Sequence, residues 1–175
     1  MLAEKITNIR LSQSLAEVAS GDMSALADIY ERLGKQIFAL AFSILNDRRD
    51  AEDAMQDTFV KLARYADSYR PNGSARAWIM ATARNAALDI AHERRRNAAG
   101  SEEELENVTD GSDIAAACEV NAMLETLEET DRQIVILHAA NGYTFGEIGE
   151  VTGITAEAAR KRYARAIRKL KDEFS

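Results

Sequence analysis

The stretch Thr144–Arg165, TFGEIGEVTGITAEAARKRYAR, decides how this chain is organised. Thr144 and Glu147 have the spacing of a capping box, in which each side chain caps the backbone at the start of a helix. Gly153 suits a turn that needs a positive backbone φ angle, and Thr155 can cap a second, longer helix. A short capped helix, a glycine turn and a longer helix predict a helix-turn-helix.

The second helix of this motif has the residue types of a DNA-binding helix. Side chains in its first turns can enter the major groove and contact base edges, while later basic residues contact phosphates. The residues that we expect at the DNA are Thr155, Ala156, Glu157, Arg160, Lys161 and Arg165. The alternative is an ordinary helical hairpin with a solvated basic face. Pattern, turn and charge agree, and together they favour DNA binding.

The composition of the whole chain indicates an all-α protein. Only 6% of its 175 residues are aromatic and it has one proline, whereas strands favour aromatic and β-branched residues. Apolar residues recur at helical spacing and predict helices over about 12–20, 24–45, 50–63 and 75–95. Trp78 falls within this apolar pattern and is expected in the core. Three or four shorter helices follow later, one of them opened by a second capping box at Thr130 and Gln133.

The net charge of −7 is unusual for a DNA-binding protein, but it is unevenly distributed. Residues 1–97 carry 14 Lys and Arg against 13 Asp and Glu, residues 98–125 carry eight acidic residues and no basic one, and residues 126–175 carry eight of each. A glycine-containing stretch of one charge sign buries too little apolar surface to offset its ordering entropy. We therefore expect two small helical domains, 1–97 and 121–175, joined by a flexible acidic linker at 98–120.

Several functional classes have no support in the sequence. A single cysteine, Cys118, excludes an internal disulfide framework and a cysteine-rich zinc site. His92 and His138 are isolated, and no glycine-rich phosphate loop or GxSxG motif is present, so nothing indicates an enzyme, a metal or a cofactor. No apolar run approaches the roughly 20 residues that cross a bilayer. Glu4 and Lys5 stand where a secretory signal needs its apolar core, so we expect a cytoplasmic protein without membrane insertion.

Two polar groups precede the linker. Asp53, Gln56 and Asp57 stand at positions i, i+3 and i+4, so they share one helix face that is either simply solvated or a protein-docking surface. Positions 94–96 are all arginine and end the fourth predicted helix. Taken alone, this cluster favours a solvated helix end over a nucleic-acid contact.

In combination these features resemble the extracytoplasmic-function (ECF) group of RNA polymerase sigma factors. The resemblance runs from Leu15 to Leu170. AEDAMQDTF, AWIMATARNAALD and the arginines after them follow the order and spacing of the family's second region, and LEETDRQIVILHAANGYTFGEIGEVTGITAEAARKRYARAIRKL resembles its fourth region. The chain departs from the family at Ala158 and Ala159, where a threonine-valine pair is common, and at Tyr163, where leucine is usual. Both regions in order, joined by a short linker, are highly specific.

The resemblance implies a set of partners and the residues that contact them. Core RNA polymerase would be bound through its largest and second-largest subunits, with Asp53, Gln56 and Asp57 docking on the clamp coiled coil of the largest. The loop before the fourth helix and the helix itself would recognise and melt the minus-ten element, and the helix-turn-helix would bind the minus-thirty-five element. An anti-sigma factor is implied as a further partner. The minus-ten residues would be Arg70, Asn72, Arg76, Arg84, Asn85, Arg94, Arg95 and Arg96.

Two other functions stay open at this point. A conventional helix-turn-helix regulator would bind DNA tightly without polymerase and would leave the Asp53 face unused. A decoy that mimics a sigma factor would bind its partners without starting transcription. The linker adds one expectation: its charge lies between two basic clusters and can screen either within a Debye length of about 8 Å, so the free chain should bind duplex DNA poorly.

Overall fold

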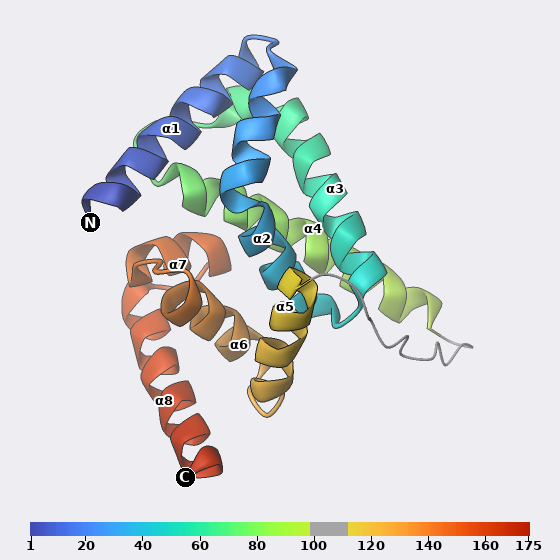
Figure 1. Cartoon of the computed structure of the whole chain (residues 1–175), viewed down its shortest axis with the longest axis vertical. Helices are drawn as coiled ribbons and strands as arrows, with labels where there is room; N and C mark the ends of the chain where they lie inside the picture. Colours follow the sequence, from blue (N-terminus) through green and yellow to red (C-terminus); the bar gives the residue numbers. More distant parts are fainter. Residues whose placement is uncertain (99–111) are drawn as a thin grey trace.

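The computed structural model of the chain describes residues 1–98 and 112–175, and all regular structure within those ranges is helical (Figure 1). The prediction of an all-α protein is therefore confirmed. Of the flexible linker predicted at 98–120, residues 99–111 lie outside the described residues, and residues 112–120 are instead helical, in α5 (Ser112–Met123). In the described part of the chain, no helix is both long enough and apolar enough to cross a membrane.

The first half of the chain is a four-helix group built around α2. Its helices are α1 (Leu2–Ala19), α2 (Leu26–Leu45), α3 (Arg48–Tyr65) and α4 (Ala75–Asn97), with single 3-10 turns η1 (Met23–Ala25) and η2 (Ala66–Ser68). Ile29, Ile37 and Leu40 are fully buried along α2, which packs on α3 and α4. Asn46 ends α2 in the left-handed conformation at φ 49°, and Asp47 caps α3 by accepting a 2.9 Å hydrogen bond from the Asp50 backbone.

The second half contains the predicted helix-turn-helix. Its elements are α5 (Ser112–Met123), α6 (Glu129–Val135), the π-helical turn η3 (Ile136–Ala140), α7 (Phe145–Thr152) and α8 (Ala156–Phe174). At the start of α7, Thr144 Oγ1 accepts from the Glu147 backbone at 3.1 Å and the Glu147 carboxylate accepts from the Thr144 backbone at 2.9 Å. Thr155 caps α8, with 3.1 Å between its Oγ1 and the Ala158 nitrogen. The predicted capping box and cap are confirmed.

Two glycines shape the turn between α7 and α8. Gly153 has φ 78°, the left-handed conformation that the sequence predicted for it. A Cβ at Gly149 would lie 2.6 Å from the Ile154 carbonyl oxygen, so only glycine lets the backbone approach this closely. Ile148 and Ala159 are fully buried between the two helices. These contacts set the angle at which α8 projects from the molecule.

Three details differ from the sequence predictions. The capping box at Thr130 is wrong: α6 begins at Glu129, and the Glu128 cap makes no side-chain hydrogen bond. The first helix begins at Leu2, ten residues earlier than predicted, because its first turns leave apolar side chains such as Ile6 exposed and so show no buried periodicity. Trp78 is only half-buried, with its ring 5.5 Å from that of Tyr69.

The two halves of the chain share one hydrophobic core. Leu11, Leu33 and Met80 from the first half lie in the same buried cluster as Tyr143 and Ile148 from the second. α4 packs along α7, and α2 contacts α6, so the helix-turn-helix lies against the four-helix group (Figure 1). Domains that the sequence presents as separate units are in extensive contact in this structure.

Candidate functional surfaces

The polar face of α3 is open to solvent. Asp53, Gln56 and Asp57 are all exposed, while Ala54 and Leu62 on the other side of the helix are buried against the core. Two carboxylates and an amide are therefore presented together without a partner helix over them. This arrangement is suited to docking another protein.

The side of α8 that the sequence predicts to contact DNA is equally open. All six residues predicted to face DNA are exposed: Thr155, Ala156, Glu157, Arg160, Lys161 and Arg165. Lys161 pairs with Glu157 at 3.1 Å, an exposed contact of small energetic value. Arg162, on the inner side, donates to the buried Asp131 of α6 at 2.7 Å and so fixes α8 on its support.

The residues predicted at the minus-ten element divide into two groups. Arg70, Asn72, Asn85, Arg95 and Arg96 are exposed. Arg70 donates to the Asp67 carbonyl at 2.7 Å, which holds the loop before α4 in place. The other three residues, Arg76, Arg84 and Arg94, are bound to other parts of the chain.

Arg76 is the most deeply buried of these arginines, with 6% of its surface exposed. Its Nε donates to Glu147 Oε1 at 2.8 Å and its Nη2 to Glu147 Oε2 at 2.6 Å, a bidentate ion pair between α4 and α7. Nη2 also donates to the Gly142 carbonyl at 3.1 Å, and the guanidinium lies 4.2 Å from the centre of the Tyr143 ring. The pair joins the N-terminal end of α4 to the first helix of the helix-turn-helix.

The carboxylate of Glu147 is saturated with hydrogen bonds. Besides Arg76 it accepts from Ser74 Oγ at 2.7 Å and from the Thr144 backbone at 2.9 Å. Burial alone would raise the pKa of Glu147, but the hydrogen bonds from Arg76, Thr144 and Ser74 outweigh it and hold the pKa at about 2. Burial acts to lower the pKa of Arg76, and the hydrogen bond and charge of Glu147 more than reverse it. Both groups are therefore charged.

Arg84 and Arg94 also contact other parts of the chain. Arg84 Nε donates to Gln133 Oε1 of α6 at 2.6 Å, and burial lowers the pKa of this half-buried arginine without uncharging it. Arg94 forms ion pairs with Asp50 and with Asp47 at the start of α3, the latter at 3.5 Å. Arg94 thus fixes α4 on α3, whereas Arg84 makes a second bridge to the C-terminal half.

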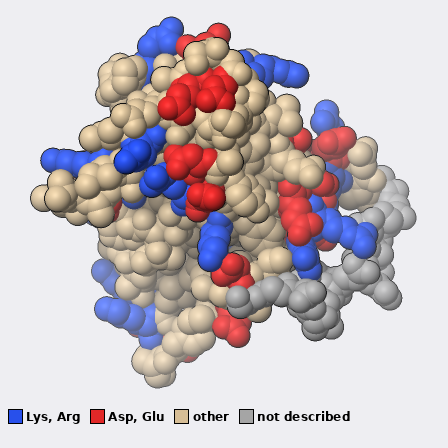
Figure 2. Space-filling view, turned by 45° about the horizontal axis from the view of Figure 1, so that its top comes forward, with Lys and Arg blue, Asp and Glu red and all other residues tan. Residues whose placement is uncertain are grey.

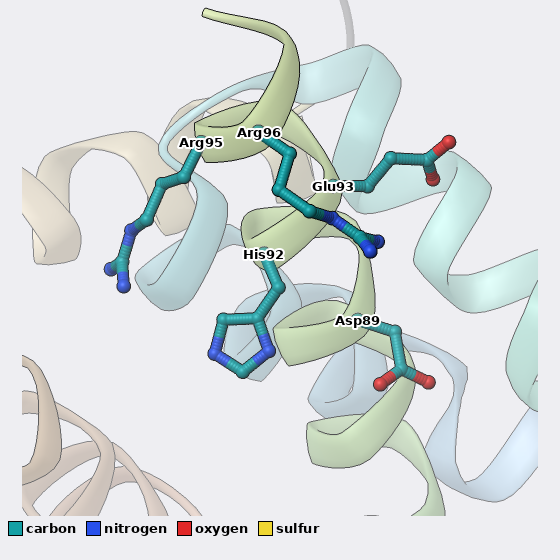
Figure 3. A pocket seen from close by; sticks show the side chains of 5 residues that line it. All are labelled: Asp89, His92, Glu93, Arg95 and Arg96. Atoms are coloured by element: carbon teal, nitrogen blue, oxygen red, sulfur yellow. The ribbon is translucent and has the colours of Figure 1, made fainter.

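The last turns of α4 carry a shallow pocket lined by Asp89, His92, Glu93, Arg95 and Arg96. Figure 3 shows Arg96 on the same side as Glu93 and Asp89, with Arg95 pointing to the other side of the helix. Acidic and basic groups thus share this end of the helix. The two arginines do not form a continuous basic surface with each other.

Charge over the face of the molecule in Figure 2 is mixed: Lys and Arg alternate with Asp and Glu, and this face has no broad basic field. Among the described residues, no group of His, Cys, Asp and Glu could hold a metal ion. His138 is stacked on Phe145 with ring centres 4.3 Å apart and meets the edge of Tyr163 at 4.6 Å. It has a packing role in the helix-turn-helix.

Glu147, Gln133 and Tyr143 are the site residues that sequence reasoning missed. Glu147 was identified only as half of a capping box, and its contact with Arg76 joins positions 71 residues apart in the chain. No local spacing encodes such a contact. The only available signal was Arg76 itself, an arginine without a neighbouring acidic residue in the apolar stretch after Pro71.

Two family models match the chain in the order that these surfaces suggest. Sigma-70 region 2 matches residues 29–98, and Sigma-70, region 4 matches residues 119–170. RNA polymerase sigma factor CarQ of Myxococcus xanthus is 30% identical over 157 residues, which cover 87% of this chain and 90% of CarQ. ECF RNA polymerase sigma factor SigK of Mycobacterium tuberculosis is 26% identical, with 93% of this chain and 92% of SigK covered.

Solved structures share the fold. CnrH in complex with the cytosolic domain of CnrY has a TM-score of 0.73 at 25% identity, covering 94% of this chain and 97% of that one. The sigma factor RpoE of Bartonella quintana, solved with the anti-sigma factor NepR, has a TM-score of 0.65 at 23% identity, covering 83% and 95%. At that identity the second likeness shows the fold alone.

The chain belongs to the ECF group of the sigma-70 family of RNA polymerase sigma factors. It is an alternative sigma factor, a DNA-binding protein of transcription initiation and not an enzyme. Its partners as a member of this family are core RNA polymerase and promoter DNA.

Proposed function

We propose that three surfaces of this chain carry its work as a sigma factor: the exposed face of α3, the loop 69–74 with α4, and α8. The observation that supports this assignment best is that regions 2 and 4 occur in order while the α3 face stays uncovered. A regulator that binds DNA without polymerase has no use for that face. The domains would be 1–97 and 121–175, with the acidic segment 98–120 between them.

The α3 face would dock on the clamp coiled coil of the largest polymerase subunit. Asp53, Gln56 and Asp57 offer two carboxylates and an amide on one side of a helix. Complementary charges at such a surface speed association and set orientation. Val60, one turn further along and 57% exposed, adds apolar surface beside them.

The two DNA-binding surfaces would divide the promoter. On α8, Arg160 and Lys161 would contact base edges or phosphates of the minus-thirty-five element. Arg70 and Asn72 of the loop, with Asn85 and the arginines of α4, would hold melted bases and phosphates of the minus-ten element. Flipped bases bound by protein offset an unstacking cost of a few kcal/mol, so melting needs no ATP site.

A cytoplasmic location and an anti-sigma partner belong to the same proposal. Core polymerase and promoter DNA are in the cytoplasm, so that is where this chain would act. The solved relative CnrH is bound to the cytosolic domain of CnrY, and together with the resemblance to ECF sigma factors this supports an anti-sigma partner here.

Run-off transcription with purified core polymerase on a promoter library tests the proposal. Asp53→Ala with Gln56→Ala should reduce both core binding and transcription, because it removes a carboxylate and the amide that would contact the polymerase. Since both side chains are exposed, the two substitutions should have little effect on folding. The control variant, Gln13→Ala with Glu17→Ala, also loses one amide and one carboxylate, but from an exposed face of α1. Its core binding and its transcription should both be unchanged.

The same assay separates the three functions. A conventional regulator would bind an operator tightly while adding nothing to transcription by core polymerase. A decoy would bind polymerase without producing transcripts. Unchanged core affinity in the Asp53/Gln56 variant would remove the docking assignment even if the chain supports transcription.

A further inference from the structure

The loop 69–74 is fixed at both of its ends to the first turn of α4. At one end, Tyr69 is half-buried, and its ring lies 5.5 Å from the ring of Trp78 at an angle of 58°. At the other end, Ser74 caps α4, and its Oγ accepts from the Ala77 backbone at 3.2 Å. The Trp78 backbone donates to the Ser74 carbonyl at 3.0 Å, so the two fixed points are neighbours on the helix.

Between these points the loop is open to solvent. The four residues after Tyr69 are all exposed, and they include Arg70 and Asn72, which we assign to minus-ten DNA. Arg70 donates to the carbonyls of Asp67 and Tyr69, at 2.7 and 3.2 Å. These bonds shape the turn locally and do not reach α4. Tyr69 is the one aromatic residue of the loop, and its contact with Trp78 ties this end of the loop to the helix.

The position of Tyr69 also shapes the surface beside the loop. Tyr69, Pro71 and Gly73 line one side of a shallow groove of about 440 Å³, and α1 lines the other side with residues such as Ile9 and Ala16. A displacement of Tyr69 would therefore change the shape of this groove. It would also change the direction in which the exposed residues of the loop project.

Trp78 is suited to hold this position. Two aromatic rings in a tilted arrangement stabilise each other beyond the area that they bury. Both rings also pack against the buried core, which supports the pair from the protein side. A loop that is ordered before it binds does not lose conformational entropy at binding, and it binds more tightly for that reason. A single ring contact can thus favour capture of a melted base without touching the DNA.

We propose that Trp78 is a positioning residue for promoter melting: through its contact with Tyr69, it keeps the loop 69–74 in the conformation that receives the melted minus-ten strand. Trp78 itself does not contact the DNA. This inference rests on the proposed function, because it assigns a role within minus-ten melting. Its physical content, that Tyr69 is held against Trp78 in solution, is tested on the free chain.

The first experiment uses Trp78 as the probe, because it is the only tryptophan of the chain. Tyr69→Leu removes the ring that covers Trp78 and keeps an apolar side chain, whereas Tyr69→Phe keeps the ring. Acrylamide should quench the fluorescence of Trp78 about twofold more efficiently in Tyr69→Leu than in the original chain. Tyr69→Phe should behave like the original chain. Equal quenching in Tyr69→Leu and the original chain would overturn the proposal.

Tyr30→Leu is the matched control. The Tyr30 ring lies 5.7 Å from that of Phe59 at an angle of 51°, so this variant breaks a ring pair of nearly the same geometry between α2 and α3. It should leave the quenching of Trp78 unchanged. Thermal unfolding of Tyr30→Leu and Tyr69→Leu gives the stability lost with one ring, so that an effect on promoter melting can be separated from an effect on folding.

The second experiment measures promoter opening by holoenzyme assembled from core polymerase and the full chain. The promoter is one recovered by run-off transcription, with 2-aminopurine in its minus-ten element. Tyr69→Leu should slow the rise of fluorescence by about tenfold, the upper end of what one ring pair contributes, with unchanged core binding. Tyr69→Phe should restore the rate, and Tyr30→Leu should not slow it. Equal slowing in Tyr30→Leu would assign the effect to stability and would overturn the proposal.

A double-mutant cycle separates positioning from direct contact with DNA. In the Trp78→Leu background, Tyr69→Leu should have no further effect on the rate of opening, because the ring contact is already lost. A further loss of the same size would mean that Tyr69 contacts the melted strand by itself, and this result would refute the positioning role. If Trp78→Leu loses helical circular dichroism, Trp78→Phe replaces it, and the effect of Tyr69→Leu should then be reduced.

The two experiments also distinguish this inference from the proposed function. Failure of the original chain to bind core polymerase or to transcribe would refute the proposed function. The quenching comparison on the free chain would still decide whether Tyr69 is held against Trp78.

Discussion

α4 and α8, the two helices that we assign to promoter DNA, look alike in the sequence but differ in the structure. Both carry arginines at regular intervals. On α8 the residues predicted to face DNA are all exposed, and the helix is supported at Asp131 by the inner Arg162 at 2.7 Å and by a longer contact from Arg165 at 3.5 Å. On α4, Arg76, Arg84 and Arg94 are all engaged by the chain itself. Arginine spacing indicates a binding helix, but it does not tell whether the ligand is DNA or the protein's own carboxylates.

The largest difference between α4 and α8 should appear in the stability of variants that lose an arginine from each helix. Arg76→Ala should lower the free energy of unfolding by about 4 kcal/mol, because it leaves Glu147 buried with an unpaired charge. Arg160→Ala on α8 should change it by less than about 0.5 kcal/mol, because that side chain is exposed. Urea unfolding followed by circular dichroism measures both, and equal effects would remove the contrast between the two helices.

The stability that the Arg76–Glu147 ion pair of α4 contributes should also depend on acid. Because the pKa of Glu147 is about 2 in the folded chain and near 4.5 when exposed, its contribution is fully present above about pH 5 and is lost as the pH falls through 4.5 toward 2. Between about pH 6 and pH 3, the original chain should lose about 2 kcal/mol more stability than Glu147→Gln. Parallel stability profiles for the two chains would show that the ion pair contributes little.

For the exposed helix α8, the position relative to α7 should depend on Gly149. In Gly149→Ala the new Cβ must move away from the Ile154 carbonyl, and this should cost about 1.5 kcal/mol and shift α8 relative to α7. Gly146→Ala, on the same helix, meets only an ordinary contact at 3.8 Å and should be neutral or slightly stabilising. Thermal unfolding of the two variants measures this difference, and similar melting temperatures would contradict the close approach.

The smallest effect concerns the first turn of α8. Thr155→Ala removes the cap that accepts from the Ala158 backbone and should cost about 1 kcal/mol, while Thr155→Ser should keep nearly all of it. The minus-ten surface of α4 should be unaffected in both variants. A chemical denaturation series on the three chains shows whether serine restores the stability that alanine removes.

The helix-turn-helix was predictable because its signals are local. Thr144 with Glu147, the positive φ of Gly153 and the cap at Thr155 each follow from residues within a few positions of one another. The second capping box failed although its signal is local too. The cap of α6 is Glu128, two residues before Thr130, and Gln133 is instead buried with its side chain on Arg84.

The contacts of Arg76 were not predictable from the sequence. Its partners come from α1, from the segment before α7 and from α7 itself, and each is distant in the chain. The charge of Arg76 indicated an exposed residue, since isolated buried arginines are rare. Only the assembled fold shows that Glu147 supplies the compensation.

The burial of Tyr143 gives the contact between the two halves of the chain an optical signature. Burial raises the pKa of this phenol well above the ordinary value, although the neighbouring Arg76 acts in the opposite direction. When the chain is titrated with alkali, Tyr143 should stay protonated as long as the two halves remain packed. Ultraviolet absorbance of the phenolate therefore reports whether water reaches Tyr143. An unlabelled sample can thus report the separation of the two halves in a spectrophotometer.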